Sequence, residues 1–178
     1  MLKRLSLAAA LAALIAIPAL AQGIPSPETS ATAGEKATVT LFTEDSVGDV
    51  QLGMLGLQKG HNAAVRALAR AMVRDHTRTA NEGLQAAKLL GADDVQLKAG
   101  DENQVELSHL ARYSGAAFDR EYVSALIDAH KNDIGTAQHA LEFTTSPALR
   151  TYLRATIAVD RRHLAIAQAV QQQVGKGD

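Results

Sequence analysis

The chain has 178 residues, a formal net charge of −1 and no cysteine, so the sequence predicts one domain that depends on its hydrophobic core and has no disulfide bonds. This charge gives no basic surface for nucleic acid, and we expect no nucleic-acid partner. The sequence also has no Gly-rich phosphate loop, serine nucleophile elbow or cysteine nucleophile, which excludes the common nucleophilic enzymes.

The first 21 residues predict a cleaved signal peptide. Lys3-Arg4 forms a short basic segment, residues 5–20 form an apolar run, and Ala19-Leu20-Ala21 has the small-x-small pattern of a cleavage site. A retained membrane anchor fits less well, because it needs about 18–20 apolar residues and no cleavage site. We expect cleavage near Ala21-Gln22 and a periplasmic or secreted mature protein with a formal charge of −3, not an integral membrane protein.

Residues 22–37 are rich in Gly, Pro, Ser, Thr and Ala without periodicity, and they predict a flexible leader. The folded domain is expected to cover residues 38–173, and residues 174–178 are expected to form a disordered tail. Within the domain, the first long helix should begin near Thr43, a plausible N-cap, and end at Lys59-Gly60. Its glycines, among them Gly53, lower helix propensity but allow a neighbouring helix to approach closely.

The later helices have clear start and stop signals. The second is predicted from the N-cap Asn62 to Leu90, with Gly91 after its end. A polar crossover and a short helix over 103–113 precede the third long helix, over 116–143. Ser146 and Pro147 are typical of the start of the fourth. The pattern predicts an all-α, antiparallel, ferritin-like four-helix bundle with a short extra helix in the crossover between long helices two and three.

Three histidines interrupt the apolar faces of three of these helices, namely His76, His130 and His163. Asp160 lies three residues before His163, so both side chains project from the same face of the fourth helix. Three imidazoles and one carboxylate suit a single Zn, Mn, Fe or Cu ion. The candidate metal ligands are therefore His76, His130, His163 and Asp160, and no catalytic or other cofactor-binding residues are identified.

The same histidines also fit a structural interpretation. Buried imidazoles hydrogen-bonded to aspartates or tyrosines would fix the register of the bundle without binding a metal. The candidate partners are Asp49, Asp75, Asp133, Asp160, Tyr122 and Tyr152. A di-iron centre is disfavoured, because such centres in bundles use several Glu ligands and two Glu-x-x-His pairs. Here one comparable pair exists, at residues 160 and 163, with Asp in place of Glu.

Several motifs follow one another along the domain: Asp49-Val50-x-Leu52-Gly53, Val65-x-x-Leu68-Ala69-x-x-Met72-Val73-x-Asp75-His76-Thr77, Phe118-Asp119-x-x-Tyr122, His130 and His163-Leu164. In order and spacing they resemble the bacterial domain of unknown function 4142 over about residues 38–173. The resemblance implies an exported ferritin-like bundle, often labelled a predicted outer-membrane protein. That label does not suit this chain, and we expect a periplasmic location.

Three features of this chain, at position 49, at positions 157–158 and at position 160, depart from the pattern of this family. The family usually has Glu at the position of Asp49 and a Leu-Pro pair at the position of Ile157-Ala158. Position 160 is more often apolar, so a metal role for Asp160 would be peculiar to this branch. The family has no settled activity, and the resemblance therefore defines the fold more closely than the function.

On these grounds we expect a periplasmic, ferritin-like bundle that is not an enzyme and acts through protein or envelope contacts, for example under stress. In this interpretation it needs no cofactor. The alternative is a metal-binding or metal-dependent redox protein that holds a divalent or iron ion at a His/Asp site in the bundle core.

Overall fold

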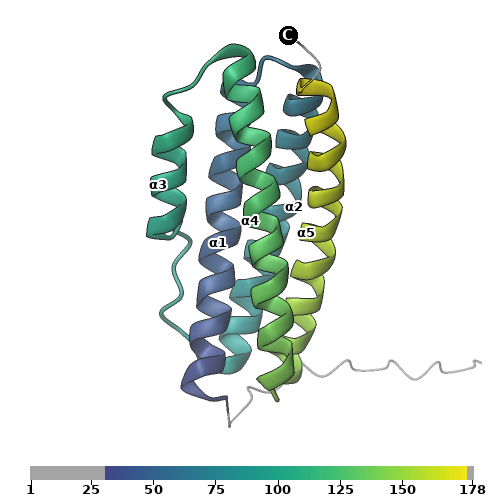
Figure 1. Cartoon of the computed structure of the whole chain (residues 1–178). Helices are drawn as coiled ribbons and strands as arrows, with labels where there is room; N and C mark the ends of the chain where they lie inside the picture. The colour runs from purple at the N-terminus through teal and green to yellow at the C-terminus, as the bar shows by residue number, and fades with distance from the viewer. Residues whose placement is uncertain (1–30, 176–178) are drawn as a thin grey trace, which may run out of the picture.

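The computed structural model describes residues 31–175, and within this range all regular structure is helical (Figure 1). The five helices are α1 (Ala33–Lys59), α2 (Ala63–Leu90), α3 (Asp101–Leu110), α4 (Gly115–Phe143) and α5 (Pro147–Val174). The predicted signal peptide, residues 22–30 of the predicted leader and the last residues of the predicted tail lie outside the described residues. The predicted all-α bundle is confirmed.

The four long helices pack as two hairpins, α1 with α2 and α4 with α5, and the hairpins join along α2 and α5. Neighbouring helices are antiparallel. The connection from Gly91 to Ser114 carries the chain back to the end of the bundle where α2 began, so α2 and α4 run in the same direction. This single long crossover is typical of ferritin-like bundles. The short helix α3 lies in this crossover, outside α1.

The predicted helix ends are confirmed for α2 and α5. Asn62 caps α2, and its side chain accepts a hydrogen bond from the backbone N–H of Ala64 at 2.8 Å. Gly91 ends α2 in the left-handed conformation with φ of 66°, which glycine adopts without a steric penalty. Ser146 caps α5 by accepting from the N–H of Leu149 at 3.0 Å, and Pro147 occupies the first turn.

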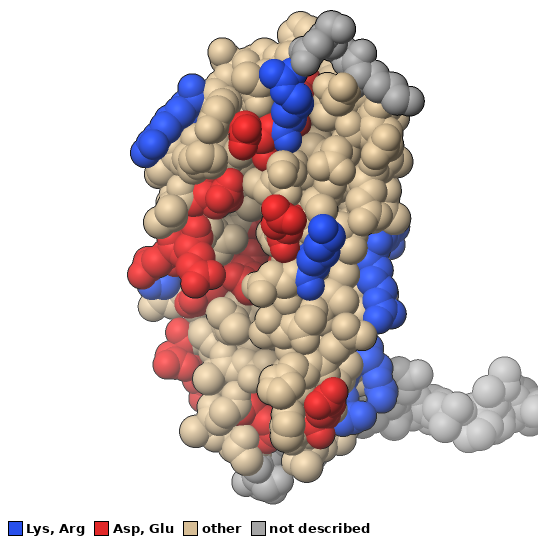
Figure 2. Space-filling model, in the orientation of Figure 1, with Lys and Arg blue, Asp and Glu red and all other residues tan. Residues whose placement is uncertain are grey.

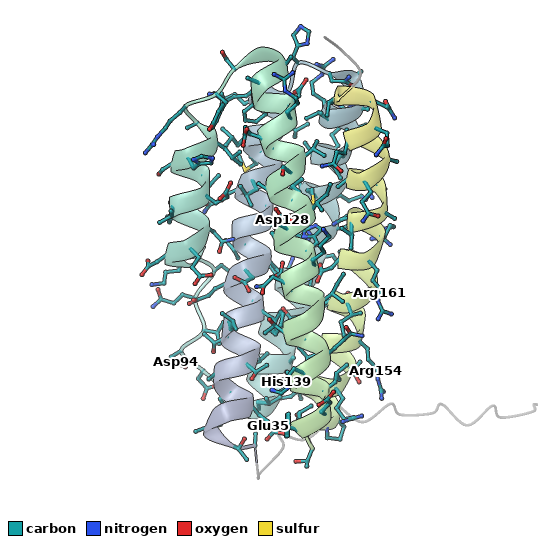
Figure 3. The ribbon with its side chains drawn as sticks, viewed as in Figure 1. Glu35, Asp94, Asp128, His139, Arg154 and Arg161 are labelled. Atoms are coloured by element: carbon teal, nitrogen blue, oxygen red, sulfur yellow. The ribbon has the colours of Figure 1, made fainter. Side chains whose placement is uncertain are left out.

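The start of α1 differs from the prediction. The helix begins at Ala33 and not near Thr43, so the C-terminal part of the predicted flexible leader is helical. Thr32 and Glu35 form a capping box at this end. The Glu35 carboxylate also accepts hydrogen bonds from the backbone N–H groups of Thr145 and Ser146, each at 2.9 Å. Glu35 therefore ties the first turn of α1 to the connection between α4 and α5, at the lower end of the bundle in Figure 3.

The buried apolar residues form two clusters, one at each end of the bundle. The upper cluster includes Leu68 and Tyr122, and the lower cluster includes Phe42 and Leu153. Between them, every long helix contributes buried polar side chains. We call these residues the polar layer: Asp49, Asp75, His76, Thr79, His130, Asp160 and His163. Within residues 31–175, no helix combines the length and the hydropathy that a membrane span requires.

Gly53 allows α1 and α2 to pack closely. A Cβ atom at this position would lie 2.8 Å from Val73 Cγ2 and 3.0 Å from the backbone oxygen of Ala69. A Cβ atom at Gly135, in the interior of α4, would meet no neighbouring atom within 4 Å. We expect Gly53→Ala to lower the free energy of unfolding by about 1–3 kcal/mol through overpacking. We expect Gly135→Ala to raise it by about 0.5–1 kcal/mol through helix propensity. Urea titrations followed by circular dichroism measure both, and a shift of the same sign in the two variants would contradict this view of Gly53.

Glu35 should make the stability of the protein depend on acid pH. Hydrogen bonds from Thr32, Thr144 and Ser146 lower its pKa to about 2. Because the folded pKa lies below the ordinary value of 4.5, this stabilisation is complete above pH 4.5 and is lost as the pH falls toward 2. We expect Glu35→Gln to cost about 1–3 kcal/mol at pH 7. Thermal unfolding should show the difference between the wild type and this variant narrowing from pH 5 to pH 2.5, and a difference that does not change with pH would rule this role out.

Candidate metal centre

The three predicted histidines meet in the polar layer. His76 comes from α2, His130 from α4 and His163 from α5, and their exposed fractions are 1%, 0% and 0%. One ring nitrogen from each lies within 4.8 Å of the others. The ring centroids are 4.9 Å apart for His76 and His163, and 5.6 Å apart for the two pairs that involve His130. We call these residues the histidine cluster.

A chain of contacts orients two of the rings. His163 Nε2 lies 3.0 Å from Asp75 Oδ2, and His163 Nδ1 lies 3.0 Å from His76 Nε2. An ionised carboxylate can only accept a hydrogen bond, so His163 Nε2 carries the hydrogen and donates it to Asp75. The lone pair of His163 Nδ1 then points toward His76, into the histidine cluster. Metal-binding histidines are commonly oriented by a carboxylate in this manner.

Asp75 is held in its ionised form. Burial by itself raises the pKa of this carboxyl, but hydrogen bonds from Arg74 and His163 and the charge of Arg162 outweigh burial and hold the pKa well below its usual range. Arg162 Nη2 donates to Asp75 Oδ2 at 2.8 Å, and Arg74 Nε donates to Asp75 Oδ1 at 2.9 Å. Since Arg162 belongs to α5, this ion pair also joins α2 to α5.

The imidazoles of His76 and His163 are neutral at ordinary pH. Burial lowers the pKa of His163 to about 4, although the hydrogen bond to Asp75 acts in the opposite direction. Burial, together with repulsion from His130 and His163, holds the pKa of His76 well below its usual range. Neutral imidazole is the form that binds metal ions.

Carboxylates approach the histidine cluster from α1 and α4. Asp49 Oδ2 lies 3.3 Å from His76 Nδ1, and Asp133 Oδ2 lies 3.8 Å from His130 Nδ1. Burial and the charges of Asp133, Asp160 and Asp45 raise the pKa of Asp49 well above its ordinary range. Burial and the charge of Asp133 also raise the pKa of Asp160 to about 8 and that of Asp45 to about 7. These aspartates repel one another, and a cation among them would relieve this repulsion.

The structure therefore brings His76, His130 and His163 together as predicted candidates, whereas Asp160 is not part of the set whose ligand atoms lie within 4.8 Å. Asp160 is buried, and its Oδ2 has no hydrogen-bond partner among the described residues. Asp49 and Asp133 instead form a second set of this kind with His130. Neither Asp49 nor Asp133 is among the predicted ligands, although the spacing of His130 and Asp133, three residues apart, was a usable signal.

Comparison with known families and structures now adds to this geometry. The model of the domain of unknown function DUF4142 matches residues 21–170. The chain belongs to this family. No curated protein shows significant sequence similarity to this chain. A solved structure described as "CopM in the Cu(II)-bound form" superposes with a TM-score of 0.66 at 18% identity, covering 78% of this chain and 96% of that one. At this identity the likeness concerns the fold.

Asp75 should contribute far more to stability than the exposed arginine beside it. Asp75→Asn removes the charge that accepts from His163 and Arg162, and we expect it to lower the free energy of unfolding by about 1.5–3 kcal/mol. Arg74 is 70% exposed, and Arg74→Gln should cost less than about 1 kcal/mol. Urea titration of both variants at pH 7 tests this expectation. Equal losses of unfolding free energy in the two variants would show that the contacts of Asp75 with α5 do not add to its contribution to stability.

Proposed function

We propose that this protein is an exported, periplasmic helical bundle that binds a transition-metal ion in its core through His76, His130 and His163. The observation that supports this most is the convergence of three buried imidazoles, with ligand atoms within 4.8 Å of one another. The sequence alone favoured a structural role for these histidines, and the geometry now favours the alternative. Export rests on the predicted signal peptide.

Unpaired nitrogens in the histidine cluster support a bound cation. Buried polar atoms in folded proteins nearly always have a hydrogen-bond partner. Both ring nitrogens of His130 and the Nδ1 of His76 have none within the described part of the chain. A metal ion in the histidine cluster would occupy a lone pair of His130 that is otherwise left unsatisfied, while His76 Nδ1 lies 3.3 Å from Asp49 Oδ2. His163 is already held by Asp75 with its Nδ1 directed toward the same space.

The donor set indicates the kind of ion. Imidazole nitrogens suit Cu, Zn, Fe and Ni, and among divalent ions Cu²⁺ generally binds such ligands most tightly. The Cu(II)-bound state of the similar bundle supports copper as the first ion to test. Asp49, 3.3 Å from His76 Nδ1, would supply a nearby carboxylate to balance the charge of the ion.

One observation favours a second candidate function. The contacts from His76 through His163 to Asp75 form a continuous buried chain between α2 and α5, and Arg162 extends it to the surface. Such a chain fixes the register of two helices without any metal. In that case the protein would act through protein or envelope contacts, and the histidines would be structural.

Metal titration separates the two functions. Cu²⁺ added to the mature protein, purified without an affinity tag, should bind at one ion per chain, as measured by calorimetry and elemental analysis. His76→Ala and His163→Ala should each lose more affinity than the 10–100-fold typical of removing a residue that only orients a ligand. The matched control is His139→Ala, because the side chain of His139 is 73% exposed on α4 and outside the histidine cluster.

Electron paramagnetic resonance of the wild type with one Cu²⁺ adds a measurement that does not depend on the folding of a variant. The spectrum should show hyperfine coupling to several imidazole nitrogens. No bound copper, or the same loss of affinity in His139→Ala, would overturn the metal-binding function and leave the structural one.

The proposed metal affinity should also change little with pH in the mildly acidic range. An exposed histidine with a pKa of about 6.5 becomes protonated, and loses its metal, as the pH falls through that value. His163 has a pKa of about 4, so its ring stays neutral down to that pH. We expect the dissociation constant for Cu²⁺ to change by less than about threefold per histidine between pH 7.5 and pH 5.5. A decrease in Cu²⁺ affinity as steep as that of a site made of two exposed histidines would place the ion outside the histidine cluster.

A further inference from the structure

A cleft of about 690 Å³ opens between α1, α3 and α4. It lies on the side of the bundle where α1 and α4 are neighbours but make few contacts with each other. Its rim carries Glu102, Glu106, Glu121 and Asp128, and Asp45 lies deeper. No lysine or arginine lines it among residues 31–175. Figure 2 shows these acidic side chains gathered around a hollow. In Figure 3, Arg154 and Arg161 point outward from α5, away from Asp128. The cleft therefore attracts cations.

The base of the cleft holds a second set of ligand atoms. Asp49 and Asp133 line the cleft, and each offers a carboxylate oxygen within 4.8 Å of a ring nitrogen of His130 and of the other carboxylate. Asp49 is 6% exposed and His130 is fully buried. Neither ring nitrogen of His130 has a hydrogen-bond partner in the described structure. A buried imidazole without a partner thus faces two carboxylates that solvent can reach through the cleft.

We propose that Asp49, His130 and Asp133 form a second cation site, at the base of the acidic cleft, for a divalent ion of the Mn²⁺ class. Two carboxylates and one imidazole suit such ions, which prefer oxygen ligands more than Cu²⁺ does. The site differs from the histidine cluster in its ligands and in its access to solvent, and it shares only His130 with that cluster. It goes beyond the proposed function, because it can bind a cation whether or not the histidine cluster does.

Mn²⁺ binding tests this site directly. Electron paramagnetic resonance of free Mn²⁺ during titration should show one ion bound per chain in the wild type and in His163→Ala, and at least tenfold weaker binding in Asp133→Asn. Asp133→Asn removes a charge that repels the neighbouring aspartates, so this variant should remain folded, and thermal unfolding verifies it. The control is Asp94→Asn, an exposed acidic residue outside the cleft, which should bind Mn²⁺ like the wild type.

Substitutions that remove charges from the rim of the cleft test whether the rim contributes to cation binding. The triple variant Glu102→Gln/Glu106→Gln/Asp128→Asn should weaken Mn²⁺ binding severalfold at low salt, and the difference from the wild type should shrink at high salt. The matched control, Glu82→Gln/Asp94→Asn/Glu142→Gln, removes the same number of charges outside the cleft and should have a smaller effect.

The outcomes distinguish this site from the proposed function. Lack of Mn²⁺ binding by the wild type, or unchanged binding in Asp133→Asn, would overturn the second site even if copper binds the histidines. Loss of Mn²⁺ binding in His163→Ala would place this ion in the histidine cluster and also overturn it. If Mn²⁺ binds as expected and copper does not, the second site holds and the proposed function fails.

Discussion

The ion pair between the buried carboxylate of Asp75 and Arg162 at the surface is the interaction on which the polar layer depends. Placing imidazoles and carboxylates between two apolar clusters costs free energy unless each polar atom is paired. Asp75 accepts from His163 on its inner side and from two arginines on its outer side, so its charge is compensated and one imidazole is fixed in orientation. The bundle can therefore carry a polar centre without losing the register of α2 against α5.

The layer divides into two parts with different chemistry. On the α2 and α5 side, His76 Nε2 and His163 Nδ1 contact each other and His163 donates to Asp75, although Asp160 Oδ2 has no hydrogen-bond partner among the described residues. On the α1 and α4 side, the groups are aspartates that repel one another, with His130 unpaired between them. The second part is the one that lies beside solvent, at the base of the acidic cleft. Crowded carboxyl groups without a compensating cation among the described residues and access to solvent thus coincide.

Much of this fold could be predicted from the sequence, because helix ends are encoded locally. Asn62, Gly91 and Ser146 act within a few residues of their own position, and their roles were confirmed. The start of α1 was missed although Thr32 and Glu35 form a local capping box there. The further contacts of Glu35 with the N–H groups of Thr145 and Ser146 are distant in the sequence and could not be predicted from it.

The histidines of the candidate site could also be predicted, since each interrupts an apolar face. Among the carboxylates, the spacing of Asp133 to His130 was a signal in the sequence, but nothing in the sequence pointed to Asp49 beside it. Spacing along one helix pointed to Asp160, whereas the approach of Asp49 to Asp133 depends on how α1 is rotated against α4. Asp45 was missed for a related reason. A helix that starts near Thr43 would have Asp45 in its first turn, where an acidic side chain complements the helix dipole.

The pairing of the helices into hairpins also has a mechanical consequence. The two hairpins contact each other mainly along α2 and α5, whereas α1 and α4, on the opposite side, contact each other little. At one end of the molecule, Glu35 links the first turn of α1 to the connection between α4 and α5. A hinge motion of the two hairpins about the contact between α2 and α5 would separate Asp49 from Asp133 but leave His76 and His163 at their spacing. Because His130 lies on α4, it would move away from His76 together with Asp133, so such a motion would widen both proposed ligand sets and keep only the spacing of His76 and His163 unchanged.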